Sequence, residues 1–258
     1  MSWSRAAAPA ATLVVVLAVW EAAGTFELIP PYLLPSPSQI LARMVQSHAL
    51  LLRQSLVTSI EIVLGFALAL GGGVLLAVGV VYVKAFEAAI YPWIVASQVV
   101  PKVALGPLFM VWLGFGLLPK VVIAFLISFF PILINAVVGL KSVETDSIFL
   151  MQSMGAGRWK VFRYLLLPNA LPSTFAGMKV AITLATVGAI VGEFVGANEG
   201  LGYLLLFANG TADTTLLFSA LVILSVLALV LYLAVYFFET IFIRWHVSRR
   251  RESVAVTM

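Results

Sequence analysis

The residues best suited to chemistry in this sequence are a few ionisable side chains inside otherwise apolar stretches. Lys102 follows Pro101 in one such stretch, and Glu61 and Lys179 lie in two others. Ionisable groups inside a bilayer are costly and therefore mark candidate functional sites. A proline frees a backbone carbonyl and permits a helix break that can line a cavity. A lysine beside that break favours an anionic ligand.

We interpret five residues as candidates for a solute pathway: Gln98, Pro101, Lys102, Asn135 and Glu193. For Lys102 the alternative is a structural kink with the lysine paired to a carboxylate, and for Asn135 it is a hydrogen bond across helices, which the sequence favours. Glu193 fits either an outer gate or a scaffold. Glu61 and Lys179 are predicted to be structural, either paired with each other or reaching opposite membrane faces.

Catalytic and nucleotide-binding patterns are absent from the sequence. The two histidines, His48 and His246, lie near opposite ends of the chain, and there is no cysteine. No serine–histidine–aspartate set, metal-ligand cluster or G-x-x-x-x-G-K-[ST] loop can be assembled. We therefore expect neither an enzyme nor a cofactor or metal site on this chain. If ATP is used, ATP and magnesium bind to a partner.

A second group of polar residues, Glu144 to Pro172, is the longest polar segment between apolar stretches. It carries Arg158, Lys160 and Arg163 within about two helical turns. Two short helical patterns meet at Gly155-Ala156-Gly157, and prolines 168 and 172 stand where a further helix is predicted to begin. A helix–glycine–helix unit with an apolar face and a basic face is typical of a docking segment, although a plain basic loop would carry similar charges.

The composition requires that these groups be positioned by membrane-spanning helices. The chain has 258 residues, of which 62% are apolar and 10% charged, and its mean hydropathy is +1.11. Ordinary soluble domains carry about 25% charged residues. We predict an all-α polytopic membrane protein. The net charge of +4 is too small to indicate nucleic-acid binding.

Spanning helices need about 20 mainly apolar residues, and the sequence contains six such stretches in a single domain covering residues 1–258. They are roughly 9–27, 55–82, 86–113 (interrupted by prolines 101 and 107), 119–141, 171–194 and 215–243, with the docking segment at 144–168. We expect the first stretch to be retained rather than cleaved, residues 38–54 to lie along the interface, and residues 200–210 to form a re-entrant or surface-lying turn. Glycines 71, 72, 73 and 79 are predicted to allow close helix packing.

The distribution of basic residues predicts the orientation. With both termini in the cytoplasm, ten basic residues lie inside and three outside, as the positive-inside rule favours. The inside set is Arg5, Lys84, Lys141, Arg158, Lys160, Arg163, Arg244, Arg249, Arg250 and Arg251, and the outside set is Arg43, Arg53 and Lys120. The docking segment then faces the cytoplasm, where a soluble partner can reach it.

The spacing of Gly155, nine further residues and Leu165-Leu166-Leu167-Pro168 resembles the EAA motif of bacterial ABC-importer permeases, EAA-x3-G-x9-I-x-L-P. Residues 99–125 and 178–205 are similar to the corresponding segments of the nitrate/sulfonate/taurine branch, so the resemblance covers nearly the whole chain. The departure is that Phe149, Leu150 and Met151 stand where the family has E-A-A. Glu144 and Asp146 lie upstream and could substitute.

The resemblance implies a multi-pass permease in the bacterial inner membrane that forms a homodimer around the solute path. It also implies cytoplasmic ABC ATPase subunits, an extracytoplasmic substrate-binding protein and a coupling helix. The residues expected to couple to the ATPase are Ser153, Met154, Gly155, Ala156, Arg158, Trp159, Lys160, Leu167 and Pro168. The branch carries sulfonates, taurine or nitrate, and relatives carry pyrimidine vitamin precursors or riboflavin.

Two interpretations from other classes stay open. An ATP-independent channel or secondary carrier would transport solute alone, although no internal repeat is visible in the sequence. A membrane scaffold would bind a partner through the docking segment without transport, and the missing glutamate of the motif is compatible with that. The sequence does not decide the solute.

Overall fold

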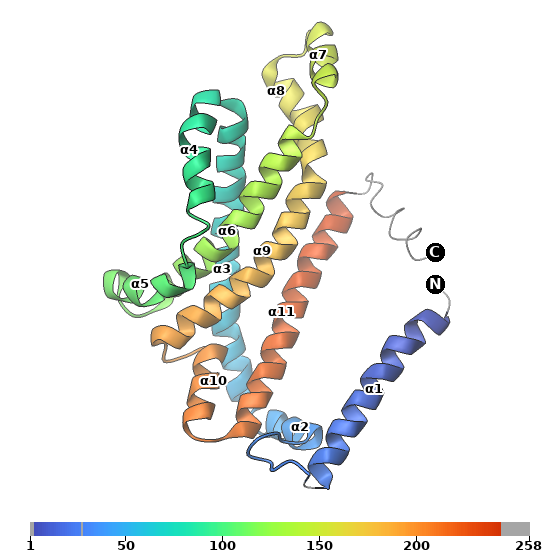
Figure 1. Cartoon of the computed structure of the whole chain (residues 1–258), viewed down its shortest axis with the longest axis vertical. Coiled ribbons are helices and arrows are strands. Elements are labelled where there is room, and N and C mark those ends of the chain that lie inside the picture. The colour runs from blue at the N-terminus through green and yellow to red at the C-terminus, as the bar shows by residue number, and fades with distance from the viewer. Residues whose placement is uncertain (1–2, 27, 244–258) are drawn as a thin grey trace. The chain divides into compact units, whose positions relative to one another are not determined.

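The computed structural model describes residues 3–26 and 28–243, and the elements in these residues are all helices (Figure 1). The N-terminal elements are α1 (Trp3–Thr25), α2 (Pro37–Gln46), α3 (His48–Tyr82) and α4 (Lys84–Ala96). A 3₁₀ turn, η1 (Lys102–Leu105), precedes α5 (Gly106–Leu113) and α6 (Leu117–Lys141). They are followed by α7 (Thr145–Ser153), α8 (Arg158–Val161), a π turn η2 (Phe162–Leu166), α9 (Leu167–Gly196), α10 (Leu201–Gly210) and α11 (Thr214–Phe242).

Four helical stretches of the described chain are long and apolar enough to cross a membrane. They are His48–Tyr82, Leu117–Lys141, Arg158–Gly196 and Thr214–Phe242. The predicted span 86–113 is not one helix, because α4 ends at Ala96 and the chain turns before Pro101. Pro107 does not interrupt a helix, since it lies in the first turn of α5, where proline is tolerated.

The chain forms two compact units. The first comprises Met1–Ser59 and Ala197–Leu227, and the second Ile60–Gly196 and Ala228–Met258. The core of the second unit lies where α3, α4, α6 and α9 meet, and it is aliphatic throughout. Its buried residues are Ala77, Val80, Ile94, Leu133, Ala136, Val137, Leu140, Val161, Leu166 and Ala170.

Glycines bring α6 and α9 into backbone contact in the second unit. A Cβ at Gly188 would stand 2.6 Å from the Ala124 Cα, and one at Gly177 would stand 2.6 Å from the Pro131 carbonyl oxygen. Small residues at such crossings allow close packing where lipid gives no hydrophobic driving force. Among the predicted glycines of α3, Gly73 is close to α6, since a Cβ there would stand 3.1 Å from Ile132 Cγ2, whereas a Cβ at Gly71 would meet nothing within 4 Å in the described chain.

The helix expected to begin at Pro168 or Pro172 instead begins at Arg158 and continues to Gly196. The π turn η2 lies immediately before Pro168, and the Leu167 amide closes it by donating to the Phe162 carbonyl. Proline has no amide hydrogen to donate to a helical hydrogen bond. The wider π turn before Pro168 lets the helix continue without that bond. The consequence is that the basic segment is continuous with a long helix.

In the first unit, α10 is held by side chains of α3. The Gly200 amide donates to Gln54 Oε1 at 2.6 Å, and the Leu201 amide donates to Thr58 Oγ1 at 2.8 Å. Both acceptors are buried, and they satisfy amides that a helix N-terminus leaves unpaired. Residues 200–210, expected as a re-entrant or surface-lying turn, are therefore a capped helix too short to span a bilayer.

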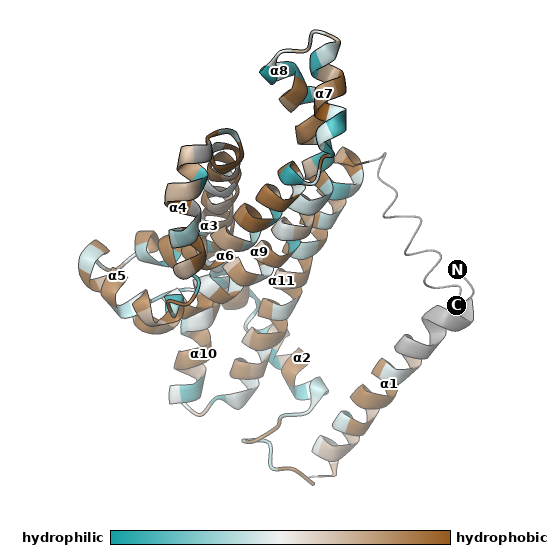
Figure 2. Ribbon diagram, turned by 45° about the horizontal axis from the view of Figure 1, so that its top comes forward, coloured by the Kyte–Doolittle hydropathy of each residue, from teal (hydrophilic) through white to brown (hydrophobic). Residues whose placement is uncertain are grey.

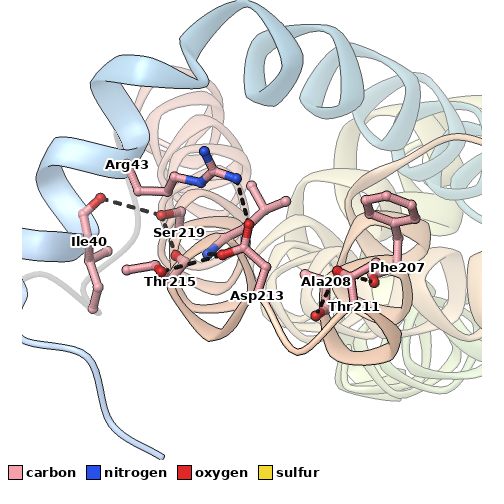
Figure 3. Close-up of polar contacts among 9 residues, drawn as sticks. Ile40, Arg43, Phe207, Ala208, Thr211, Asp213, Thr215 and Ser219 are labelled. Atoms are coloured by element: carbon pink, nitrogen blue, oxygen red, sulfur yellow. Dashed lines mark hydrogen bonds and ion pairs between the residues drawn. The ribbon is translucent and has the colours of Figure 1, made fainter. Parts of the chain in front are cut away.

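Asp213 connects α2 to the start of α11 (Figure 3). Its Oδ2 pairs with Arg43 Nη2 at 2.5 Å, and its Oδ1 accepts the Leu216 amide at 3.0 Å as the helix N-cap. Partial burial opposes ionisation, but the amide and the guanidinium outweigh it and lower the pKa of Asp213 below its usual range. Residues 38–54, expected to lie along the interface, are divided between the short helix α2, capped by Ser36, and the first turns of the long helix α3.

Candidate functional site

The docking segment comprises α7, the turn 154–157 and α8, and it follows the end of α6. The turn closes when the Met154 amide donates to Leu150 and the Ala156 amide to Met151. Gly155 has φ of +81°, a backbone region in which side chains other than glycine are strained. The glycine expected from its spacing is therefore required by the backbone.

Large side chains of the docking segment are unusually exposed. Met154 is 80% exposed and Trp159 72%, and Phe149 and Leu150 are also mostly exposed. Figure 2 shows hydrophilic residues gathered among these apolar ones in α7 and α8. Arg158 and Lys160 are exposed between them. An exposed apolar and basic surface is suited to binding a protein partner.

The remaining predicted coupling residues support this surface. The Ser153 hydroxyl donates to the Phe149 carbonyl inside α7, and Ala156 packs against the core of the second unit. Leu167 and Pro168 are half-buried at the start of α9. These four residues hold the turn and its neighbouring helix in place.

The break after α4 carries the lysine singled out as a pathway candidate. Lys102 is half-buried, and its Nζ lies 4.3 Å from the centre of the Phe130 ring. Among the described residues, none of the ion pairs involves Lys102. Gln98 and Pro101 are exposed beside it. A cation held over a ring and not paired to an acid remains available to an anion.

Asn135 and Glu193 lie in the helix packing of the second unit. The Asn135 side chain donates to the Pro131 carbonyl of its own helix at 2.8 Å, so the predicted hydrogen bond across helices is replaced by one within α6. Glu193 is 1% exposed and interacts directly with Glu61.

The buried ion pair of the second unit differs from the predicted one. Lys120 Nζ donates to Glu61 Oε1 at 2.6 Å, with both side chains almost fully buried. Lys179, predicted either to pair with Glu61 or to reach the opposite membrane face, pairs with Glu239 at 2.9 Å. Lys120, counted among the basic residues on the outer side, lies buried in the first turn of α6. The sequence did not identify Lys120 as a buried ion-pair residue, because the end of a span and a buried first turn of a helix have the same composition.

Ion pairs hold all three basic residues that the predicted orientation counts outside, and this does not reduce its excess of basic residues inside. Lys120 is buried in an ion pair, so its charge does not report on a loop. Arg43 is also paired, with Asp213. The basic residues Arg244, Arg249, Arg250 and Arg251, together with His246, lie outside the described residues.

Comparison with known families places the geometry in context. Residues 69–247 match the family described as binding-protein-dependent transport system inner membrane component. This range contains the docking segment, the break at Lys102 and the buried ion-pair residue Lys120.

Curated relatives cover nearly the full chain. The riboflavin transport system permease protein RibX of Chloroflexus aurantiacus is 40% identical over 92% of this chain and 89% of its own length. The formylaminopyrimidine transport permease protein ThiX of Halalkalibacterium halodurans is 36% identical over 93% of this chain and 96% of its own length.

A solved structure shares the fold. A chain of the inward-facing MetNI methionine ABC transporter superposes with a TM-score of 0.58, covering 78% of this chain and 98% of that one, at 22% identity. At this identity the likeness shows the fold alone.

Proposed function

Because this chain belongs to the family of binding-protein-dependent transport system inner membrane components, it is a permease subunit of an ABC importer and not an enzyme, and we propose that it couples to its ATPase through the docking segment. It is a multi-pass inner-membrane protein. The observation that carries the proposal is the exposed surface of α7 and α8 around Gly155.

The proposed contact is apolar where the family motif is acidic. Phe149 is 60% exposed and Leu150 63% exposed at two of the positions that match E-A-A. Arg158, Trp159 and Lys160 flank them across the turn. We infer that the partner groove is apolar at its centre and acidic at its rim, because exposed apolar side chains need an apolar partner and cations need carboxylates.

The assembly proposed around this contact follows the family. Two copies of the chain would enclose the solute path, two ATPases would bind ATP and magnesium at the end that carries α7 and α8, and a binding protein would deliver solute at the other end. Both termini would then lie in the cytoplasm. The ATPase motion would reach the spans through α8, since α8, η2 and α9 form one continuous stretch.

For the solute we propose a small heterocycle of the vitamin or vitamin-precursor class. The names of RibX and ThiX support this, since both are transport permeases for such compounds. Exposed aromatic side chains on and beside α5, Trp112 and Phe115, supply flat surfaces. Lys102 favours a second class, sulfonates and other anions, because it has no acidic partner among the described residues.

Co-purification tests the docking proposal. The full chain is co-expressed with a candidate ABC ATPase, and the retained ATPase is measured for wild type, Gly155→Ala and Gly157→Ala. Gly157 is the matched control, because its φ of −69° suits any residue and a Cβ there meets nothing within 4 Å in the described chain. We expect Gly155→Ala alone to weaken binding about tenfold, since a side chain in the left-handed region costs roughly 1–2 kcal/mol.

A second variant separates docking from folding. Leu150→Asp places a charge on an exposed position that does not pack in the core, and it should abolish ATPase retention while the chain stays monodisperse. Equal retention in wild type, Leu150→Asp and Gly155→Ala would contradict the docking proposal.

The solute classes are separated by uptake into proteoliposomes containing the assembled importer. A heterocycle transporter should move riboflavin or a pyrimidine and be little affected by Lys102→Gln. A transporter of anions should move a sulfonate, and Lys102→Gln should raise its KM several-fold with kcat less affected. Uptake of the sulfonate alone would overturn the heterocycle proposal.

A further inference from the structure

The second unit contains a long apolar groove that the transport proposal does not use. Its volume is about 580 Å³, and it is lined by α3, α6, α9 and α11. Along α3 the lining runs from Val63 to Val78, which is about 22 Å at 1.5 Å per residue. The lining side chains are almost all hydrocarbon or aromatic, with Thr174 as a polar exception.

A second cavity of about 280 Å³ adjoins the groove at the docking segment. It is lined by Val78, Tyr82, Arg158, Trp159 and Phe162. Val78 and Phe162 line both cavities, so the two cavities are adjacent. The Tyr82 and Trp159 rings pack against Phe162 at centroid distances of 5.7 and 5.6 Å. The smaller cavity is therefore an aromatic mouth at the end of the apolar groove.

The mouth has a positive charge without an internal counter-charge. In the described chain none of the ion pairs includes Arg158, while Lys160 and Arg163 follow within two turns of the same helical stretch. Aromatic rings with one apolar and one polar end, such as those of Tyr82 and Trp159, are typical of the membrane–water interface. The ligand that fits a hydrocarbon groove with a cationic mouth is an amphipathic anion.

We propose that this groove binds one anionic phospholipid, with an acyl chain along α3 and the phosphate at Arg158. The groove length exceeds the roughly 15 Å of one leaflet's hydrocarbon, so an acyl chain can lie along it. Its volume is within the range of about 300–1,000 Å³ typical of small-molecule sites. Basic pockets between spanning helices are known to hold acidic lipid head groups. The mouth shares Arg158 and Trp159 with the proposed ATPase contact, so lipid binding is measured on the permease without its ATPase.

The test titrates lipids into the delipidated full chain in detergent and counts bound lipid by native mass spectrometry. Phosphatidylglycerol and phosphatidylethanolamine with identical acyl chains are compared, and inorganic phosphate is added as a competitor. We expect one saturable phosphatidylglycerol per chain, bound about fivefold more tightly than phosphatidylethanolamine, the factor for one basic residue near an anionic lipid.

Paired variants test the cationic mouth and the apolar groove separately. Arg158→Gln should remove the preference for phosphatidylglycerol, and Lys160→Gln, a cation of the same helix outside the mouth, should keep it. Ala234→Trp should block the groove and weaken both lipids, because Ala234 is an exposed lining residue of α11. Val230→Trp, exposed on α11 and outside the lining, should leave binding unchanged.

Tryptophan fluorescence of the chain with its groove unaltered provides a readout that does not depend on the Arg158, Lys160, Ala234 and Val230 variants. Phosphatidylglycerol brominated on its acyl chain should quench tryptophan emission, and Trp159→Phe should remove the quenched component. The proposal would be overturned by equal binding of the two lipids, by equal effects of Arg158→Gln and Lys160→Gln, or by normal lipid binding in Ala234→Trp. It would also be overturned if inorganic phosphate alone displaced the bound phosphatidylglycerol. Loss of lipid on formation of a dimer would assign the groove to a second copy instead.

Discussion

At the scale of single residues, the energetic effect of removing a charged side chain depends on how deeply its ion pair is buried. Lys120 and Glu61 are nearly fully buried and paired at 2.6 Å, whereas Lys179 and Glu239 pair with about a fifth of each side chain exposed. Removing one member of a buried pair leaves an uncompensated charge, which costs far more than the pair contributes. The two lysines therefore differ in consequence despite their similar sequence surroundings.

We predict that Lys120→Met lowers stability by about 3–5 kcal/mol, the cost of leaving Glu61 buried and unpaired. Lys179→Met should cost clearly less, because its pair is partly solvated. The double variant Glu61→Gln/Lys120→Met should recover much of the loss. Thermal midpoints of the four proteins in one detergent measure this, and an unchanged midpoint for Lys120→Met would contradict it.

Asp213 gives a prediction about pH. Its folded pKa is lowered, chiefly by the Leu216 amide and Arg43 acting against burial. The stability it adds is therefore fully present above its unfolded pKa of about 3.9 and is lost as pH falls through the folded pKa.

Asp213→Asn is the matched control, because its amide oxygen can still cap α11 but has no charge to titrate. Wild type should be more stable than this variant at pH 6, and the difference should begin to fall below about pH 4 and vanish once the pH is below the folded pKa. Thermal midpoints across pH follow the difference. A constant difference would show that Arg43 does not stabilise the carboxylate.

At the scale of elements, backbone contact between α6 and α9 organises the second unit. Gly188, Gly177 and Gly139 stand where a Cβ would meet the neighbouring helix within 2.9 Å. Gly71, in the glycine run of α3, has no such neighbour in the described chain. Membership of the conspicuous run therefore does not by itself constrain a glycine, since Gly73 of the same run is close to α6 and Gly71 is not.

We predict opposite effects for two glycine-to-alanine changes. Gly188→Ala should destabilise by about 1–3 kcal/mol, because its Cβ overlaps Ala124 and forces the helices apart. Gly71→Ala should be neutral or stabilise by up to about 1 kcal/mol, since alanine favours helix and the space is open. Thermal midpoints in one detergent decide the matter. Equal effects would mean that α6 and α9 are not in backbone contact.

At the scale of the whole molecule, the proposed role of the chain is to supply a solute path and a mechanical connection to the ATPase. The docking segment continues into α9 without an interruption, and α9 packs on α6, which carries Phe130 under Lys102. A displacement of α8 therefore acts on the helices beside the candidate path. This continuity is what an ATP-driven mechanism requires.

We predict that solute enters proteoliposomes only when the ATPase, ATP and the loaded binding protein are all present. The permease alone, placed in a proton or sodium gradient, should give no uptake above empty liposomes, because nothing in the proposed mechanism uses an ion gradient. Radiolabelled solute measures both arms. Uptake by the permease alone would establish the carrier alternative instead.

The sequence by itself determined the class and the helical fold, and it located the turn at Gly155. Composition and long apolar runs are local properties, and in lipid they leave helices as the available spanning structure. Gly155 and the Leu-Pro end were identifiable because motif spacing is written along the chain. The break before Pro101 was predictable for the same reason.

Only the tertiary structure decided the partners of the charges and the packing glycines. Glu61 could have met Lys179 or Lys120, and the choice depends on which helices are neighbours. In the sequence nothing distinguishes Gly188 from Gly71, and the two differ only because α9 lies against α6. Likewise, Phe66 and Phe238 are ordinary apolar residues in the sequence, and they line one groove because α3 and α11 both face it. Contacts between distant segments follow from helix arrangement, which local pattern does not encode.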